Sequence, residues 1–167
     1  VYLQWLAAWP WSALALASSV LEDLRARHPQ AAQVRIEAPA DLPAWSVDAA
    51  RLRLLLRNLL DNAINYTPSS LEKPAVITAR VLADPFGKII LLQVEDSGPG
   101  IPAAERELVF QPFYRALGTE TDGSGLGLPI VLEIAHQHHG EVTLDDTRPG
   151  QTPPGARFSV RFSTETA

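Results

Sequence analysis

Residues 49–66 carry the pattern that most restricts how this chain can fold. Asp48 fits the N-cap of a helix over this stretch, and apolar side chains recur along one of its faces at helical spacing. They are Leu52, Leu55, Leu56, Leu59, Leu60 and Ala63. A helix with so wide an apolar stripe is stable when another layer of structure covers the stripe, so the pattern predicts a layered domain.

The segments on either side supply the other layer. Alternating or continuous apolar residues predict strands over 34–38, 76–82, 88–95, 141–146 and 156–162. Helical spacing predicts two more helices, one from Ser12 to the residues before Pro29 and one that opens at Gly125 and ends before Gly140. We expect the α/β class, a two-layer sandwich with a five-stranded mixed sheet and about three long helices on one face.

The composition fits a single domain and narrows its chemistry. The chain has 167 residues, of which 46% are hydrophobic, enough for one full-sized core. It has no cysteine, which excludes disulfides and thiolate metal sites. The formal net charge is -5, with acids and bases mixed, whereas proteins that bind nucleic acid usually carry a basic stripe. We therefore expect no nucleic-acid partner.

The first 21 residues contain no charged side chain, and this length approaches that of a membrane span. Pro10 between two tryptophans, several serines and the lack of a basic flank argue against a span. We expect an amphipathic helix from Ser12 instead. Residues 12–167 would then form the domain, and residues 1–11 would be the end of a longer connection.

Three asparagines, Asn58, Asn62 and Asn65, lie on the predicted 49–66 helix. At about 100° per residue they fall within about 60° of one another, beside the apolar stripe. Asparagine is a poor helix former, so the strip has a local cost that Lys or Glu would avoid. Amide oxygens are suitable Mg²⁺ ligands. A metal site and a solvated polar face are both compatible with this helix alone.

Two further motifs involve glycine. DSGPG (96–100) follows a predicted central strand, where Asp96 can accept a hydrogen bond from an exocyclic amine; the alternative is a plain turn. GSGLGL (123–128) opens a predicted helix, where backbone N–H groups can bind phosphate; the alternative is a packing device. The long segment between them, with one short helix expected over 103–110, is the kind of loop that usually has a function.

Taken in order, N-x-x-x-N-A, D-x-G-x-G, F-x-x-F-Y-R and G-x-G-L-G-L resemble the N, G1, F and G2 boxes of the ATP-binding catalytic domain of sensor histidine kinases. The resemblance covers residues 12–163. This family belongs to the Bergerat-fold ATPases, together with gyrase B and Hsp90. The resemblance implies a Bergerat fold with a long ATP lid, and a protein histidine kinase of a two-component signalling system.

Carried over to this sequence, the resemblance implies a site for ATP and Mg²⁺. Asn62 would coordinate Mg²⁺, with Asn58 beside it near the phosphates. Asp96 would bind the adenine amino group, and Arg115 would lie near the terminal phosphate, where it can neutralise charge during transfer. The residues that would shape the nucleobase pocket are Tyr66, Gly98, Gly100 and Ile101. Those that would surround the phosphates are Gly123, Gly125, Leu126 and Gly127, and those that would anchor the lid are Phe110, Phe113 and Tyr114.

The sequence departs from the family in two ways. Many relatives carry a lysine at position 65, so Asn65 leaves the phosphate site one positive charge short. No histidine lies in a phosphoacceptor motif, and His28, His136, His138 and His139 are expected to be exposed helix-end residues.

The chain would then be the catalytic part of a longer kinase, and residues 1–11 a remnant of the linker to its dimerisation domain. That domain would be the direct partner and a response regulator the indirect one. The parent protein would be a homodimer anchored in the cell membrane, with this domain in the cytoplasm.

Two other functions remain. An ATP-hydrolysing switch such as gyrase B uses a Glu at the position of Asn58 to activate water, and an amide cannot act as that base. The nearest acid on the helix, Asp61, lies about 60° away from Asn58. The other alternative is a nucleotide-binding regulatory module or an anti-sigma-type serine kinase. The F-Y-R segment and the L-G-L-P-I helix start favour the histidine kinase branch.

Overall fold

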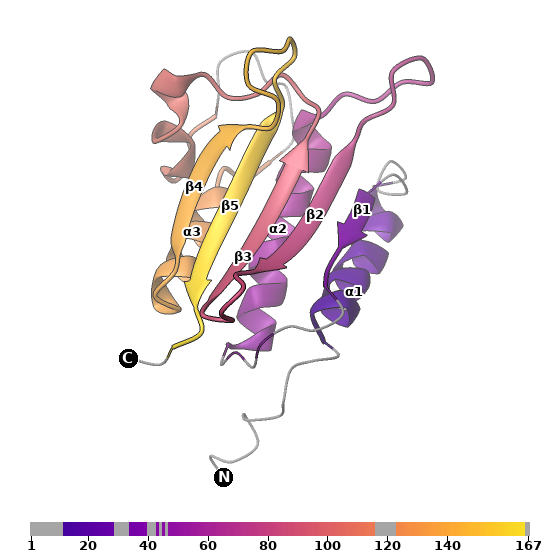
Figure 1. The fold of residues 1–167 in the computed structure, drawn as a ribbon. Helices are drawn as coiled ribbons and strands as arrows, with labels where there is room; N and C mark the ends of the chain where they lie inside the picture. The colour runs from indigo at the N-terminus through magenta and orange to yellow at the C-terminus, as the bar shows by residue number, and fades with distance from the viewer. Residues whose placement is uncertain are drawn as a thin grey trace.

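The computed structural model describes residues 12–28, 34–39, 43, 45, 47–115 and 123–165. The predicted linker remnant, residues 1–11, lies outside the described residues, as do residues 116–122 of the predicted lid. The described residues form two layers, a sheet and a set of helices that cover one of its faces (Figure 1). The expected α/β sandwich is confirmed.

The sheet has five strands in the order β1-β2-β3-β5-β4. β1 pairs parallel with β2, and the other three pairings are antiparallel, so the sheet is mixed as predicted. β2 and β3 form a hairpin, with Ala83 opposite Ile90 at its closed end. The strands are β1 (Val34–Glu37), β2 (Ile77–Ala83), β3 (Ile89–Asp96), β4 (Glu141–Asp146) and β5 (Ala156–Ser163).

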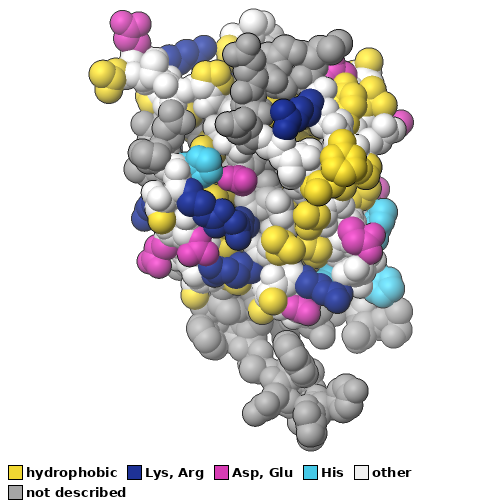
Figure 2. All heavy atoms as spheres, turned by 180° about the vertical axis from the view of Figure 1, so that it is seen from behind, with side chains coloured by type: hydrophobic (Ala, Val, Ile, Leu, Met, Phe, Trp, Pro, Cys, Tyr) yellow, Lys and Arg dark blue, Asp and Glu magenta, His cyan; other side chains and the backbone are white. Residues whose placement is uncertain are grey.

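Three α-helices form the second layer: α1 (Ser12–Arg27), α2 (Ala49–Tyr66) and α3 (Gly127–Gln137). Asp48 caps α2 as predicted, because its side chain accepts hydrogen bonds from the backbone N–H groups of Ala50 and Arg51. Figure 2 shows the helical face, on which basic and acidic side chains lie next to one another. No helix within the described ranges has the length and hydropathy needed to span a membrane.

The core lies between the helices and the sheet. The apolar stripe of α2 is buried as predicted, and Leu55, Leu59 and Leu60 have no exposed surface. They face a sheet whose inner side carries Phe158 and Phe162, which are at most 1% exposed. Each such side chain contributes about 1.5–3 kcal/mol by its removal from water. The asparagines lie beside this buried stripe on α2, so the packing of the leucines against the sheet also determines where the asparagines lie.

Ion pairs run across the other face of the sheet. Glu37 on β1 pairs with Arg80 on β2 at 2.7 Å, and Arg80 pairs with Glu95 on β3 at 3.1 Å. Glu95 also pairs with Arg157 on β5 at 2.8 Å. Because alternate residues of a strand point to opposite faces, Glu95 points away from the helices and its neighbour Asp96 points toward them. The charged face explains why only one side of the sheet is covered.

The segment 103–110 differs from expectation. Two short 3₁₀ turns, Ala103–Glu105 and Leu108–Phe110, replace the single helix that the sequence predicts. Arg106 explains the break: its Nε donates to the carbonyl of Ile101 at 3.1 Å and a terminal nitrogen donates to Asp146 of β4 at 2.8 Å. These bonds connect the segment to the edge strand β4, and the chain forms two short turns there instead of one continuous helix.

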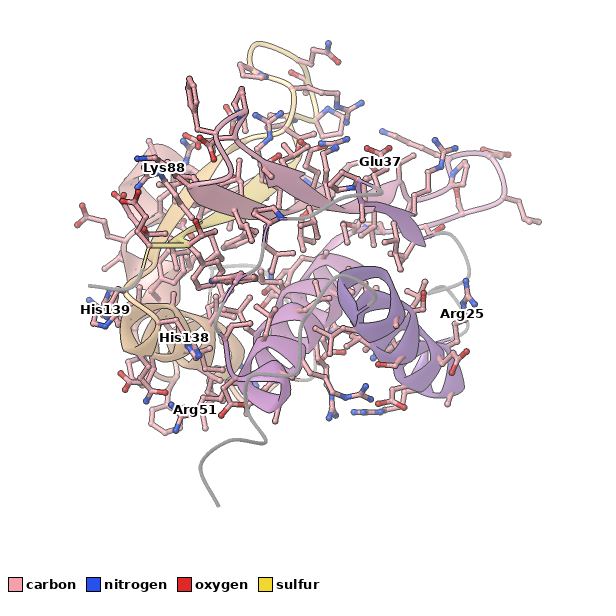
Figure 3. All side chains as sticks on the ribbon, turned by 60° about the horizontal axis from the view of Figure 1, so that its bottom comes forward. Arg25, Glu37, Arg51, Lys88, His138 and His139 are labelled. Carbon is pink, nitrogen blue, oxygen red and sulfur yellow. The ribbon has the colours of Figure 1, made fainter. Side chains whose placement is uncertain are left out.

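The prediction that all four histidines are exposed is wrong for two of them. His28 and His138 are half-buried, whereas His136 and His139 are exposed. His138 lies between the end of α3 and the start of α2 (Figure 3). Its Nε2 accepts from the Asp48 backbone N–H at 3.2 Å, and its Nδ1 lies 2.9 Å from the Ile134 carbonyl, which fixes the Nδ1–H tautomer.

We expect His138→Ala to lower the free energy of unfolding by about 1–2 kcal/mol, because the Asp48 N–H loses its partner and the Ile134 carbonyl loses one of its two. Urea denaturation followed by circular dichroism measures this loss. His136→Ala is the matched control, since His136 is exposed on the same helix. Equal stability of the two variants would contradict a structural role for His138.

Candidate functional site

A cavity of about 190 Å³ opens between α2, the end of β3, the segment after β3 and the start of α3. Among the described residues, nine of the predicted site residues line it: Asn58, Asn62, Tyr66, Asp96, Gly100, Ile101, Gly123, Gly125 and Gly127. Three do not, namely Gly98, Leu126 and Arg115. Residues that are far apart in the sequence are thus brought to one cavity, although their individual roles stay predictions.

The asparagines of α2 form one side of the cavity. Asn58 Nδ2 donates to the Leu54 carbonyl at 2.9 Å, so this amide has a fixed orientation. Its Oδ1 faces the start of α3, because a Cβ added to Gly127 would lie 3.2 Å from it. Asn62 lines the cavity one turn further along the same helix, beside Asn65. Two amide groups therefore border the cavity near a helix N-terminus.

Asp61 also lines the cavity, although the sequence motifs assign no binding role to it. Its Oδ1 lies 2.9 Å from Nε2 of His28, the residue that follows α1. His28 and Asp61 are 30% and 39% exposed. The pair joins the end of α1 to the cavity side of α2, and it engages the one carboxylate of α2 that faces the cavity.

Asp96 is the last residue of β3 and lines the cavity next to the C-terminal end of α2, because a Cβ at Gly98 would meet both Asp96 Oδ1 and the Tyr66 carbonyl. It is only 5% exposed. Its Oδ1 accepts hydrogen bonds from the backbone N–H groups of Gly98 at 2.8 Å and Ala156 at 3.1 Å. Burial raises the pKa of Asp96, and these two N–H groups oppose that rise because they favour the carboxylate. The two backbone N–H groups therefore fix the orientation of a carboxyl group whose burial disfavours its charged form.

Glycines surround Asp96 because nothing larger fits. A Cβ at Gly98 would lie 2.8 Å from the Tyr66 carbonyl oxygen, and one at Gly100 would lie 2.7 Å from Pro154. A Cβ at Gly155 would lie 2.1 Å from the carbonyl oxygen of Asp96 itself. Gly98 does not line the cavity; it allows the end of α2 to approach the turn after β3.

The ring of Phe113 is exposed in this structure, and its role as an anchor of the closing lid stays a prediction. Its side chain is 73% exposed and its backbone is left-handed, with φ of 65°. The backbone makes a connection of its own, because the Phe113 N–H donates to the Gly125 carbonyl at 2.9 Å. Phe110 does pack inward, edge-on to Phe158 with ring centroids 6.1 Å apart. Tyr114 lines the cavity.

Gly125→Ala is expected to weaken nucleotide binding about tenfold while the fold survives. Gly125 has φ of 70°, and a Cβ there would lie 2.7 Å from the Phe113 Cα, so the two backbone segments would separate. Isothermal titration with ATP measures the loss. Gly123→Ala is the control, since its Cβ would meet no described atom within 4 Å. An equal loss in both variants would contradict this steric explanation.

The start of α3 borders the cavity beside Asn58. Gly127, Leu128 and Pro129 line it, and Ser124 Oγ accepts from the Leu126 N–H at 3.3 Å. The first N–H groups of a helix have no partner within the helix and attract anions. Arg115 lies outside the cavity, and its guanidinium donates to the Gly123 carbonyl.

The cavity is also lined by residues to which the sequence interpretation assigned no role. They are Pro99, Val109, Ser124, Leu128, Pro129 and Ala156. Most are neighbours of motif residues and could have been inferred from adjacency. Ala156 could not, because the strand that carries it lies 60 positions after Asp96 and meets it only through the sheet.

A five-stranded mixed sheet with helices on one face, a buried carboxylate at a strand end and paired amides on a helix defines a Bergerat-fold ATP-binding domain. The family model described as histidine kinase-, DNA gyrase B-, and HSP90-like ATPase matches residues 47–166, and the chain belongs to this family.

Its relatives narrow the class further. The chain is 41% identical over 128 residues to the signal transduction histidine-protein kinase/phosphatase MprB of Mycobacterium sp. (strain KMS), a match that covers 75% of this chain and 24% of the relative. It is 43% identical over 119 residues to MprB of Mycobacterium leprae (strain TN), covering 70% of this chain and 22% of the relative. The chain thus spans about a quarter of the length of these curated relatives, which are longer sensor kinases.

Solved structures agree. The mycobacterial sensor histidine kinase MprB superposes with a TM-score of 0.72 and 30% identity, covering 92% of this chain and 95% of that one. Full-length ShkA in complex with AMPPNP superposes with a TM-score of 0.67 and 28% identity, covering 97% of this chain and 32% of that one. The chain is an ATP-binding catalytic domain of the sensor histidine kinase type.

Proposed function

We propose that this domain binds Mg²⁺-ATP and transfers the γ-phosphoryl group to a histidine on the dimerisation domain of its own parent protein. The observation that carries the proposal is a single cavity lined by the Asp96 carboxylate near the C-terminal end of α2, by the amides of Asn58 and Asn62 on that helix, and by the N-terminus of α3 beside Asn58. These groups suit an amine, a metal ion and a phosphate chain in one ligand.

The donor set fits each part of the ligand. Asp96 offers a carboxylate oxygen to the adenine amino group, because its other oxygen is already held by two backbone N–H groups. Tyr66 and Ile101 border the same end of the cavity and provide apolar contact for the nucleobase. Asn62, with Asn58 beside it, offers amide oxygens to Mg²⁺. The metal would neutralise phosphate charge during transfer.

The phosphate chain would lie along the glycines and the start of α3. The backbone N–H groups of Gly123, Gly125 and Gly127, which line the cavity, would donate to phosphate oxygens, and the N–H of Leu126 would join them by leaving its hydrogen bond to Ser124 Oγ. Arg115 would neutralise charge on the terminal phosphate from its position beside Gly123. Asn65 supplies no charge, which lowers the expected affinity for the phosphates relative to a lysine at that position.

The chemistry of the cavity favours transfer to histidine over hydrolysis. A neutral imidazole has a free lone pair and needs no protein base to attack phosphorus, whereas water does need one. Asn58 cannot act as a base, and the carboxylate of Asp61 already contacts His28. An acceptor histidine can therefore react in this cavity without a protein base. An attacking water molecule would need a base, and α2 has no unengaged carboxylate to act as one.

The parent protein would contain the dimerisation domain, with residues 1–11 as part of the connecting linker. The relatives of this chain are sensor kinases about three times its length, which supports additional domains in the parent. We further propose that the parent is a homodimer anchored in the cell membrane, with this domain on the cytoplasmic side, and that the phosphoryl group passes on to a response regulator.

One experiment separates the candidate functions. The domain is mixed with γ-labelled Mg²⁺-ATP and the separately expressed dimerisation domain of its parent. Acid-labile phosphate on that partner, absent when its acceptor histidine is replaced, is the expected result. Steady phosphate release without the partner would point to an ATPase, and acid-stable phosphate on serine would point to a serine kinase. Nucleotide binding with none of these would indicate a regulatory module.

A further inference from the structure

Thr67 follows directly on α2 and is buried at the end of the cavity that holds Asp96. Its side chain is 2% exposed. Its hydroxyl oxygen is one of three buried side-chain atoms without a hydrogen-bond partner among the described residues. Because buried hydroxyls are nearly always paired, an unpaired one beside a ligand site calls for an explanation.

The hydroxyl of Thr67 faces the same small space as the carboxyl of Asp96. A Cβ added to Gly98 would lie 3.2 Å from Thr67 Oγ1 and 3.0 Å from Asp96 Oδ1, so the glycine leaves these two groups near one another. Oδ1 already accepts from two backbone N–H groups. Thr67 is close enough to lower the pKa of Asp96, although it forms no full hydrogen bond in this structure.

We infer that Thr67 is a positioning residue for nucleobase recognition: its hydroxyl donates to the Asp96 carboxylate when nucleotide is bound, and this bond directs the carboxylate toward the base. The inference rests on the proposed function, in which Asp96 accepts from an exocyclic amine. A carboxylate held in this way can only accept hydrogen bonds. It therefore selects a base with an amino group at that position over a base with a carbonyl.

The other groups around Asp96 have been accounted for. Arg148, in the turn before β5, acts through its charge and lowers the pKa of Asp96. Glu95 points to the opposite face of the sheet and pairs with Arg80 and Arg157. Tyr66 lines the cavity beside Asp96. Thr67 is the side chain whose hydroxyl is both buried and unpaired next to this carboxyl, so its removal should raise the pKa of Asp96 further.

The test compares Thr67→Val, which keeps the β-branched shape and removes the hydroxyl, with Thr67→Ser, which keeps the hydroxyl. Affinities for ATP and for ITP, which has a carbonyl in place of the amino group, are measured by calorimetry between about pH 5 and pH 8. For Thr67→Val we expect a loss of ATP affinity of roughly five- to tenfold at neutral pH. The acid limit of ATP binding should move upward by about half a pH unit or more. Thr67→Ser should behave like the wild-type domain.

Four results would overturn the inference, and the fourth overturns it without touching the proposed role of Asp96. The first is a Thr67→Val variant with wild-type ATP affinity and an unmoved acid limit. The second is an equal loss for ATP and ITP in both variants together with a lower melting temperature, which would show a purely structural role. The third is equal affinity of the wild-type domain for ATP and ITP, which would also overturn the proposed role of Asp96. ATP selectivity that survives in Thr67→Val overturns the Thr67 inference alone.

Discussion

Asn62→Ala is expected to abolish the Mg²⁺-dependent part of ATP binding. The variant should bind ATP equally with Mg²⁺ and with EDTA, whereas the wild-type domain should bind about tenfold to a hundredfold more tightly with Mg²⁺. The reason is that Asn62 offers the cavity a neutral amide oxygen, and alanine has no side-chain oxygen to replace it. Calorimetric titration with and without the metal measures both affinities.

Asn65→Ala is the matched control for this prediction, because Asn65 is on the same helix and lines the same cavity but has no proposed metal contact. It should keep the response to Mg²⁺. If Asn62→Ala still bound ATP more tightly with the metal, or if both variants lost that response equally, the assignment of Asn62 as metal ligand would be wrong.

Asp96→Asn is expected to lower ATP affinity about a hundredfold and to change ITP affinity much less. The asparagine oxygen can still accept from the Gly98 and Ala156 N–H groups, so its NH₂ group would face the nucleobase. An NH₂ group cannot accept from the adenine amine, although it can donate to the carbonyl of ITP. A competition assay with the two nucleotides measures the change, and an equal loss for both would show that Asp96 is structural.

Although Asp96→Asn should weaken ATP binding, it should not lower the stability of the folded domain at neutral pH. Burial raises the pKa of Asp96 in the folded domain, so the folded state binds a proton more tightly than the unfolded chain does. The stability from this proton is fully present below the unfolded pKa and is lost as pH rises through the folded pKa. At neutral pH, Asp96→Asn should therefore unfold at no lower urea concentration than the wild-type domain. As pH falls, the free energy of unfolding of the wild-type domain should rise relative to that of the variant, because Asp96 takes up its proton.

Local sequence patterns predicted the architecture because each element satisfies its own periodicity. Helix α2 begins and ends where the N-cap and the apolar stripe placed it, and its leucines are buried as expected. The asparagines and Asp96 reach one cavity because they lie at an edge of this helix and at the end of a strand, positions that the fold then brings together.

Local patterns did not indicate contacts between residues distant in the chain. One of them is the backbone hydrogen bond from the Phe113 N–H to the Gly125 carbonyl. The burial of His138 depends on its contact with Asp48, which is 90 positions away in the chain, so the local sequence predicts an exposed side chain instead. Thr67 belongs to the C-terminal end of α2 in sequence, and only the approach of Gly98 places it beside Asp96. In each case a neighbour from another element determines the role.

The crowded glycines around Asp96 have a consequence for inhibition. Resistance to a competitive inhibitor often arises when one residue of the pocket becomes larger and blocks the compound. Gly100 lines the cavity, and Gly98 and Gly155 adjoin Asp96 outside the cavity lining. At all three positions that route is closed, because a methyl group would lie within 2.8 Å of an existing atom at Gly98, 2.7 Å at Gly100 and 2.1 Å at Gly155. For a compound that binds next to Asp96, larger side chains at these three positions would therefore disturb the fold itself, so we do not expect resistance substitutions there.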